Sequence, residues 1–167
     1  MENRASWPTT WFRVAEAVAE RSKCSRAKIG CVIVDRGQVV ISTGYNGPPP
    51  NYLGDRGGVS NGCRVWCERA KQSHTDDSYS TCPSNHAEAN AIVRADWSRM
   101  SGSTAYVTGA VCLTCAKLLA AAGVSHVVHR VSNSDSHRRP QAVESFLRQC
   151  GVSVLRVGDD YGPDIQA

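Results

Sequence analysis

Apolar residues along the chain follow two rhythms, which together predict an α/β protein. An early stretch has helical spacing and predicts a helix that Thr9 or Thr10 caps and that runs to about residue 21. Two β-branched runs at 28–34 and 38–43 flank a turn signal and predict a hairpin. Helical and strand patterns then alternate over residues 86–97, 104–108, 112–122, 124–129, 140–149 and 152–157. The order α-β-β-α-β-α-β-α-β favours a five-stranded mixed sheet with helices on both faces.

One long segment, at about residues 48–85, interrupts these rhythms. It is rich in Gly, Ser, Asn, Asp and Pro, and it contains three cysteines. A structureless loop of this length is unusual in a compact domain, and a bound metal would explain how it is ordered. We therefore predict one domain over residues 1–167 with a cysteine-rich insertion, and a loose tail after residue 158.

Composition and charge narrow the function classes. The 167 residues are 41% hydrophobic and 20% charged, which excludes intrinsic disorder. There is no apolar run long enough for a membrane span, and the N-terminus has no apolar signal region, so we expect a cytoplasmic protein with no membrane partner. The net charge of +4 fits a phosphorylated small substrate as well as a nucleic acid. We read the run at 136–139, which holds Arg138 and Arg139, as a solvated loop.

The chain contains eight cysteines, more than a protein of this size usually has. In a reducing compartment, clustered cysteines indicate metal binding or catalysis rather than disulfides. Two of them, Cys31 and Cys150, stand in apolar surroundings and are predicted to be plain buried residues.

Two short motifs at predicted helix starts carry the chemistry. Cys112 and Cys115 are three residues apart and so share a helical face, where both thiolates can reach one ion. His86 supplies a third ligand from another helix start, which leaves a fourth tetrahedral position open, as in catalytic zinc sites. Glu88 stands close to this site and is the candidate general acid and base. Taken singly, C-x-x-C is also found in redox pairs and in structural zinc sites.

The two motifs together resemble the H-x-E…P-C-x-x-C signature of zinc-dependent nucleobase deaminases. This chain departs from the signature at Val111, which stands where the pattern has proline. Proline would stiffen the loop but binds no metal, so we expect the change to be tolerated.

Further segments make the chain similar to the deoxycytidylate (dCMP) deaminase family over roughly residues 10–155. They are Arg21 to Arg26, Ile29 to Val34, Gly44-Tyr45-Asn46-Gly47, His86 to Ile92, Tyr106 to Thr108 and Cys112 to Lys117. The resemblance implies a cytidine-deaminase-like three-layer α-β-α fold. It also implies hydrolysis of dCMP to dUMP and ammonia in pyrimidine deoxynucleotide metabolism, in which zinc-bound hydroxide attacks C4 and Glu88 transfers protons.

The resemblance assigns further residues. Asn46 would lie near the nucleotide sugar, the backbone N–H of Ala87 would face the pyrimidine, and Arg26 is a candidate phosphate contact, with an ordinary surface arginine as the alternative. The family also implies a second, structural zinc, for which the candidate ligands are Cys24, Cys63, Cys67 and Cys82, with His74 as a possible replacement. Some members are hexamers that dCTP activates and dTTP inhibits, so a homo-oligomer with these effectors is expected. The segment at 130–135 lacks the aromatic residues expected there.

Other functions remain open from the residues alone. The substrate could be 5-methyl or 5-hydroxymethyl dCMP, or dCTP. From another class, the chain could be a zinc-stabilised nucleic-acid-binding module without turnover, although such a module has no need of Glu88 as a proton carrier.

Overall fold

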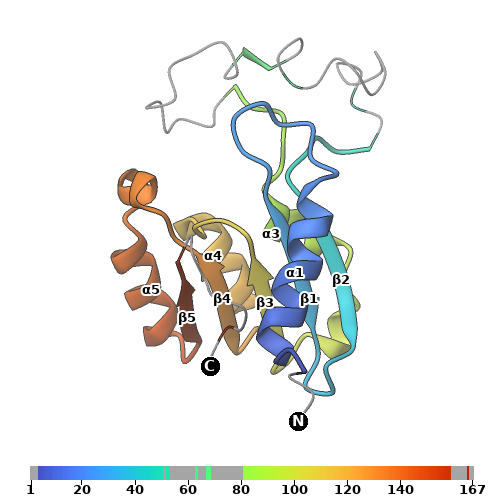
Figure 1. Cartoon of the computed structure of the whole chain (residues 1–167), viewed down its shortest axis with the longest axis vertical. Coiled ribbons are helices and arrows are strands. Elements are labelled where there is room, and N and C mark those ends of the chain that lie inside the picture. The colour runs from blue at the N-terminus through green and yellow to red at the C-terminus, as the bar shows by residue number, and fades with distance from the viewer. Residues whose placement is uncertain are drawn as a thin grey trace.

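A five-stranded sheet forms the centre of the computed structural model, which describes residues 4–50, 52, 63, 67, 68, 81–158 and 165 (Figure 1). The strand order is β2-β1-β3-β4-β5. β1 pairs antiparallel with both β2 and β3, whereas β3, β4 and β5 run parallel. The strand bounds are β1 Gly30–Val34, β2 Val40–Tyr45, β3 Thr104–Val107, β4 His126–Arg130 and β5 Ser153–Val157. The predicted hairpin and mixed sheet are thus confirmed.

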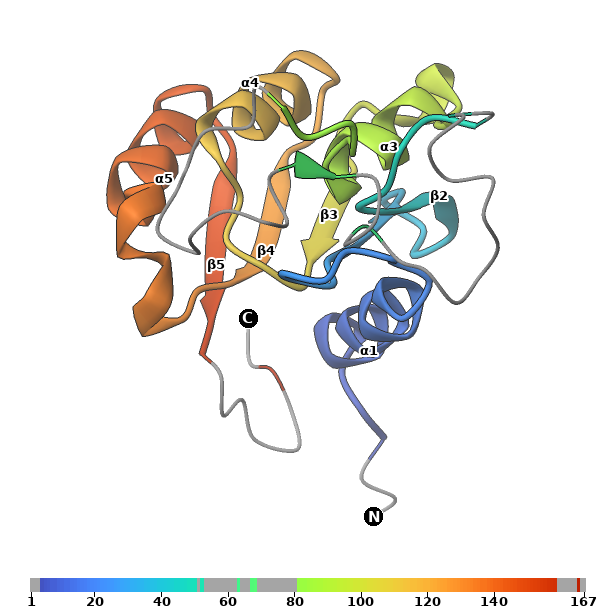
Figure 2. The same ribbon diagram turned by 90° about the horizontal axis from the view of Figure 1, so that it is seen from above.

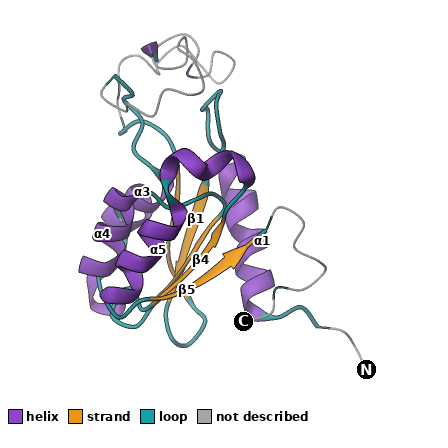
Figure 3. Cartoon of the chain, turned by 90° about the vertical axis from the view of Figure 1, so that its left-hand side faces the viewer, coloured by secondary structure: helices purple, strands orange, loops and turns teal. Residues whose placement is uncertain are grey.

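Helices cover both faces of this sheet and complete the three layers that the sequence predicts. α1 (Trp7–Ala19) lies alone on one face, and the other helices pack on the opposite face (Figures 2 and 3). The latter are α3 (Ala87–Val93), α4 (Leu113–Ala121) and α5 (Pro140–Gln149). The short 3₁₀ helices η3 (Trp97–Arg99) and η4 (Asn133–Arg138) lie in connections of the described part of the chain. No helix in the described part of the chain is both long and apolar enough to cross a bilayer.

Strand β1 shows how the sequence builds two cores from one sheet. All five of its residues are buried, and alternate side chains point to opposite faces. Cys31 and Ile33 join the core under α3, α4 and α5, while Val32 and Val34 join the core under α1. A continuous apolar run, rather than an alternating one, is what a strand covered on both faces requires.

The first and second helices differ from their predicted bounds for local reasons. Ser6, not Thr9 or Thr10, caps α1: its side chain accepts from the Thr9 N–H at 3.3 Å, and Pro8 fits the first turn behind it. The helix predicted at 86–97 ends at Val93. Asp96 then caps the N-terminus of η3, where its carboxylate accepts from the Ser98 N–H. Val93 is 79% exposed and Trp97 is 61% exposed, so neither residue contributes to the core although both fall within the range predicted to be helical.

Two further expectations are corrected. Cys150 is exposed at the end of α5, because the helix turns that position away from the core, whereas Cys31 is fully buried as predicted. The tail is anchored at Ile165, which is 5% exposed and whose N–H donates to Thr9 Oγ1 at 2.6 Å. Ser6 binds the Ile165 carbonyl oxygen at 3.0 Å.

Candidate active site

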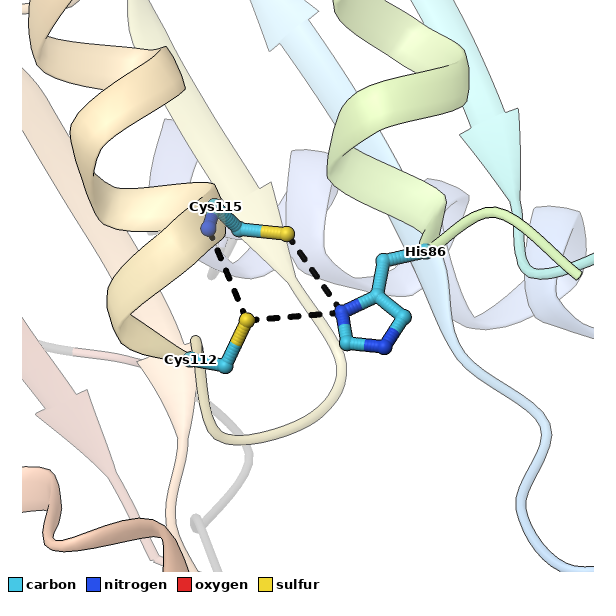
Figure 4. Close-up of side chains that lie close together, drawn as sticks. All are labelled: His86, Cys112 and Cys115. Carbon is cyan, nitrogen blue, oxygen red and sulfur yellow. Dashed lines mark hydrogen bonds between the residues drawn. The ribbon is translucent and has the colours of Figure 1, made fainter. Parts of the chain in front are cut away.

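Three potential metal ligands converge from the starts of two neighbouring helices. His86 is the N-cap of α3 and Cys112 is the N-cap of α4, both with extended backbone, and Cys115 lies in the first turn of α4. His86 Nδ1 is 3.4 Å from Cys112 Sγ and 3.4 Å from Cys115 Sγ (Figure 4). The helices pack against each other on the same face of the sheet, so two motifs 26 residues apart in sequence form one site.

This donor set fits a zinc ion. Ligand atoms held at about 2.0–2.3 Å from a tetrahedral zinc lie roughly 3.5 Å from one another. The separations between His86 Nδ1 and the two sulfur atoms have this size. Among the described residues, this is the one group of three or more potential ligands close enough to share an ion.

The electrostatics of the three groups favour a thiolate. Hydrogen bonds from Cys115 and His86 lower the pKa of Cys112 to about 3. The hydrogen bond with Cys112 raises the pKa of Cys115, and the one between Cys112 and His86 raises the pKa of His86. Negative charge is thus stabilised on a sulfur at the N-terminus of α4, where the helix dipole favours it further.

Glu88 lies beside this group, in the first turn of α3. It is 3% exposed, and burial raises the pKa of its carboxyl, so the carboxyl binds a proton more readily than an exposed glutamate. Such a group, on a cavity wall and next to three potential metal ligands, can accept and return protons.

A cavity of about 540 Å³ opens over His86 and Glu88. Its size is in the range of small-molecule sites. Five segments line it: residues 24–29, Asn46, residues 82–88, Ala110 and the 3₁₀ helix η4. His86 and Glu88 lie on its wall, together with Ala87, Asn46 and Arg26, three residues predicted as substrate contacts.

Asn46 has a clear structural task within this wall. Its Oδ1 accepts from the Ile29 N–H at 2.8 Å and its Nδ2 donates to the Ala27 carbonyl at 2.9 Å. The side chain thereby clamps the segment that carries Arg26 against the end of β2. Ala87 is fully buried at the start of α3, and Arg26 is partly exposed on the cavity wall.

Comparisons with known proteins agree with this geometry. The family model described as "Cytidine and deoxycytidylate deaminase zinc-binding region" matches residues 5–131.

The chain belongs to the cytidine and deoxycytidylate deaminase family.

Individual relatives point the same way. The chain is 36% identical over 129 residues to the deoxycytidylate deaminase of Mycobacterium phage D29, covering 76% of this chain and 96% of that one. It is 34% identical to the enzyme of Schizosaccharomyces pombe over 90% of this chain, but it spans only 44% of that relative's length. A crystal structure of the dCMP deaminase from cyanophage S-TIM5, in complex with dCMP and dUMP, superimposes with a TM-score of 0.63 at 27% identity. That match covers 89% of this chain and 94% of the other.

One residue of this site, Arg138, differs from its sequence-based expectation of a solvated position. Arg138 lines the cavity, and its Nη1 donates to the Ala110 carbonyl at 3.2 Å, next to the loop that carries Cys112. A run of charged residues predicts a solvated loop, but it does not reveal which of its side chains turns inward. Arg139 beside it is exposed. The αL backbone of Arg139, with φ of 50°, marks the sharp junction between η4 and α5.

The four cysteines predicted for a structural zinc lie as two pairs. Cys63 Sγ accepts from the Ser25 N–H at 3.0 Å, and its charge helps to raise the pKa of Cys24, which burial chiefly raises. Cys67 and Cys82 have their sulfur atoms 3.9 Å apart. Over the described residues the four do not form a second group close enough to share one ion. His74, the alternative ligand, lies outside the described residues.

Proposed function

We propose that this protein converts dCMP to dUMP and ammonia by hydrolysis. The observation that carries the proposal is the arrangement of Glu88 beside the His86, Cys112 and Cys115 group, on the wall of a cavity of nucleotide size. The relative from phage D29 is named a deoxycytidylate deaminase, and the match covers 96% of that relative. The S-TIM5 structure, bound to dCMP and dUMP, has the same fold.

Different residues of the cavity wall are proposed to contact different parts of the nucleotide. The Ala87 backbone is proposed to contact the pyrimidine, because it lies between His86 and Glu88 where the reacting ring must sit. Asn46 is proposed to lie near the sugar while it holds the segment at 27–29 in place. Arg26 is the proposed phosphate contact, and Arg138 adds a second positive charge to the same wall.

The chemistry follows from the protein groups around the ring. A zinc ion held by His86, Cys112 and Cys115 would supply an activated water. Glu88 takes a proton from that water and delivers it to N3 of the cytosine, and a second transfer to the exocyclic amine lets ammonia leave. The C4–N bond breaks, a C4–O bond forms, and one water is consumed for each ammonia released.

Five finer features accompany this proposal; the first three rest on the family resemblance, and the last two rest on the sequence itself. We propose a second, structural zinc held by Cys24, Cys63, Cys67 and Cys82. We also propose a homo-oligomer, regulation by dCTP and dTTP, and action in the cytoplasm as a single catalytic domain.

The decisive experiment measures ammonia release from dCMP by the purified full chain with known zinc content. We expect turnover by the native protein and by Glu20→Gln, an exposed control, and none by Glu88→Gln although its zinc content stays unchanged. Absence of turnover by the zinc-loaded native protein, with dCTP added, would refute the dCMP assignment. The modified nucleotides, dCTP and RNA would then be the substrates to test, and binding of nucleic acid without any turnover would favour the non-enzymatic reading.

A further inference from the structure

A buried histidine on the sheet accepts a hydrogen bond from the loop that leads into Cys112. His129, on β4, is fully buried and lies 18 residues from the loop in sequence. Its Nδ1 is 3.3 Å from the backbone nitrogen of Val111, which is itself fully buried. The bond from Arg138 to the Ala110 carbonyl holds the opposite side of the same peptide group, which joins Ala110 to Val111. The peptide group just before the metal ligand Cys112 is therefore held on both sides by side chains from elsewhere in the fold.

The hydrogen bonds of His129 determine its tautomer. A backbone N–H can only donate, so Nδ1 must be the unprotonated acceptor and Nε2 must carry the ring proton. Nε2 lies 3.2 Å from Glu144 Oε1, a carboxylate oxygen that accepts the hydrogen bond from Nε2–H. Burial also lowers the pKa of His129, which agrees with a neutral ring.

Glu144 is itself held in place. It is 5% exposed on α5, and its Oε1 accepts from Arg156 Nε at 3.0 Å and Nη2 at 2.7 Å. Arg156 stands opposite His129 in the parallel pairing of β4 with β5, so the sheet register sets these two side by side. The guanidinium of Arg156 compensates the negative charge of the buried Glu144 carboxylate. The carboxylate is thereby fixed where it accepts the hydrogen bond from the imidazole of His129.

Val111, the partner of His129, departs from the deaminase signature. The deaminase signature has proline where this chain has Val111, and proline has no N–H to donate. Val111 therefore brings a buried donor into the loop, and a buried donor without an acceptor is costly. His129 provides the acceptor.

We propose that His129 is a positioning residue for the metal site, which accepts the Val111 N–H and so fixes the approach of Cys112 to zinc, compensating for the missing proline. The expected effects on zinc binding and turnover rest on the proposed function. The hydrogen bond between Val111 and His129 does not depend on zinc or on turnover.

Zinc affinity provides the first test. We expect His129→Leu, measured on the full chain by competition with a chromogenic chelator, to bind the His86 site zinc about tenfold more weakly than the native protein. Cobalt substitution reports the same site optically, and the thiolate-to-cobalt absorption of His129→Leu is expected to differ from that of the native protein. Unchanged affinity and an unchanged cobalt spectrum would overturn the proposal.

Rescue by proline separates positioning from mere packing. Adding Val111→Pro to His129→Leu removes the donor that lost its acceptor, so we expect most of the tenfold loss to be recovered. Val111→Ala is the matched control, since it also changes the side chain but keeps the N–H, and it is expected to give no recovery. Equal recovery by both, or recovery by neither, would contradict the proposed bond.

A measurement that needs no histidine variant covers the case in which His129→Leu does not fold. In ¹⁵N-labelled native protein, the ring of His129 is expected to be protonated at Nε2 and not at Nδ1, and Val111→Pro is expected to shift the Nδ1 resonance. A proton on Nδ1, or an Nδ1 resonance that Val111→Pro leaves unmoved, would refute the inference. This readout requires neither zinc nor dCMP, so it stands even if the proposed reaction fails.

Discussion

Gly44 of β2 and Ala87 of α3 approach so closely that a Cβ atom on Gly44 would lie 2.2 Å from the Ala87 carbonyl oxygen. It would also lie 2.4 Å from the Ala91 nitrogen. Ser42, two residues earlier on β2, donates to the Ala91 carbonyl at 2.7 Å. The strand thus seats the helix whose first turn carries Glu88, and a glycine of the Gly-Tyr-Asn-Gly segment is what permits the contact.

Gly44→Ala is therefore expected to disturb both stability and the site. The methyl group meets backbone atoms that cannot rotate away, so we expect a loss of about 1–3 kcal/mol in the free energy of unfolding. A displaced α3 also moves His86 and Glu88, so turnover should fall at 20 °C, where the protein remains folded. Urea denaturation and the ammonia assay measure the two effects. Gly158→Ala is the control, because a Cβ there meets no atom of the described residues within 4 Å, and a similar loss in both variants would contradict the explanation.

Periodicity along the sequence predicts the order of helices and strands, because apolar spacing reports directly which face of an element is buried. It also predicts the ligand motifs, since His86, Cys112 and Cys115 stand at helix starts that local signals locate. Other features depend on contacts between distant segments. Arg138 turns inward only because η4 lies over the cavity, and His129 matters only because β4 passes beneath the loop.

Turnover should depend on the metal site as a whole. Cys112→Ser replaces a thiolate by a weaker ligand, and we expect at least about a hundredfold lower activity, since even residues that only support metal ligands cost ten- to a hundredfold. Treating the native protein with a chelator should abolish activity, and added zinc should restore it. The exposed Cys150→Ser is the control and should retain full activity. Activity that survives complete removal of zinc would exclude the proposed chemistry.

The number of zinc ions tests the four remaining cysteines. If Cys24, Cys63, Cys67 and Cys82 hold a structural ion, the native protein contains two zincs per chain and Cys63→Ser contains one. The ion at His86 should then persist, whereas Cys112→Ser should lose that ion and keep the other. Elemental analysis of the purified variants checks this. One zinc in the native protein, unchanged in Cys63→Ser, would show that these cysteines are free thiols.

Arg138 is expected to tune the site through its fork of donors rather than through charge alone. Its Nη1 holds the Ala110 carbonyl, and its positive charge acts on both His86 and Glu88. Arg138→Lys keeps the charge but has neither the planar geometry nor the reach of the guanidinium. We expect about a tenfold lower kcat/KM for dCMP, the size expected when one hydrogen bond to a charged group is lost. Arg139→Lys, at the exposed neighbouring position, is the matched control and should leave kcat/KM unchanged. Native activity in Arg138→Lys would show that charge alone suffices at this position.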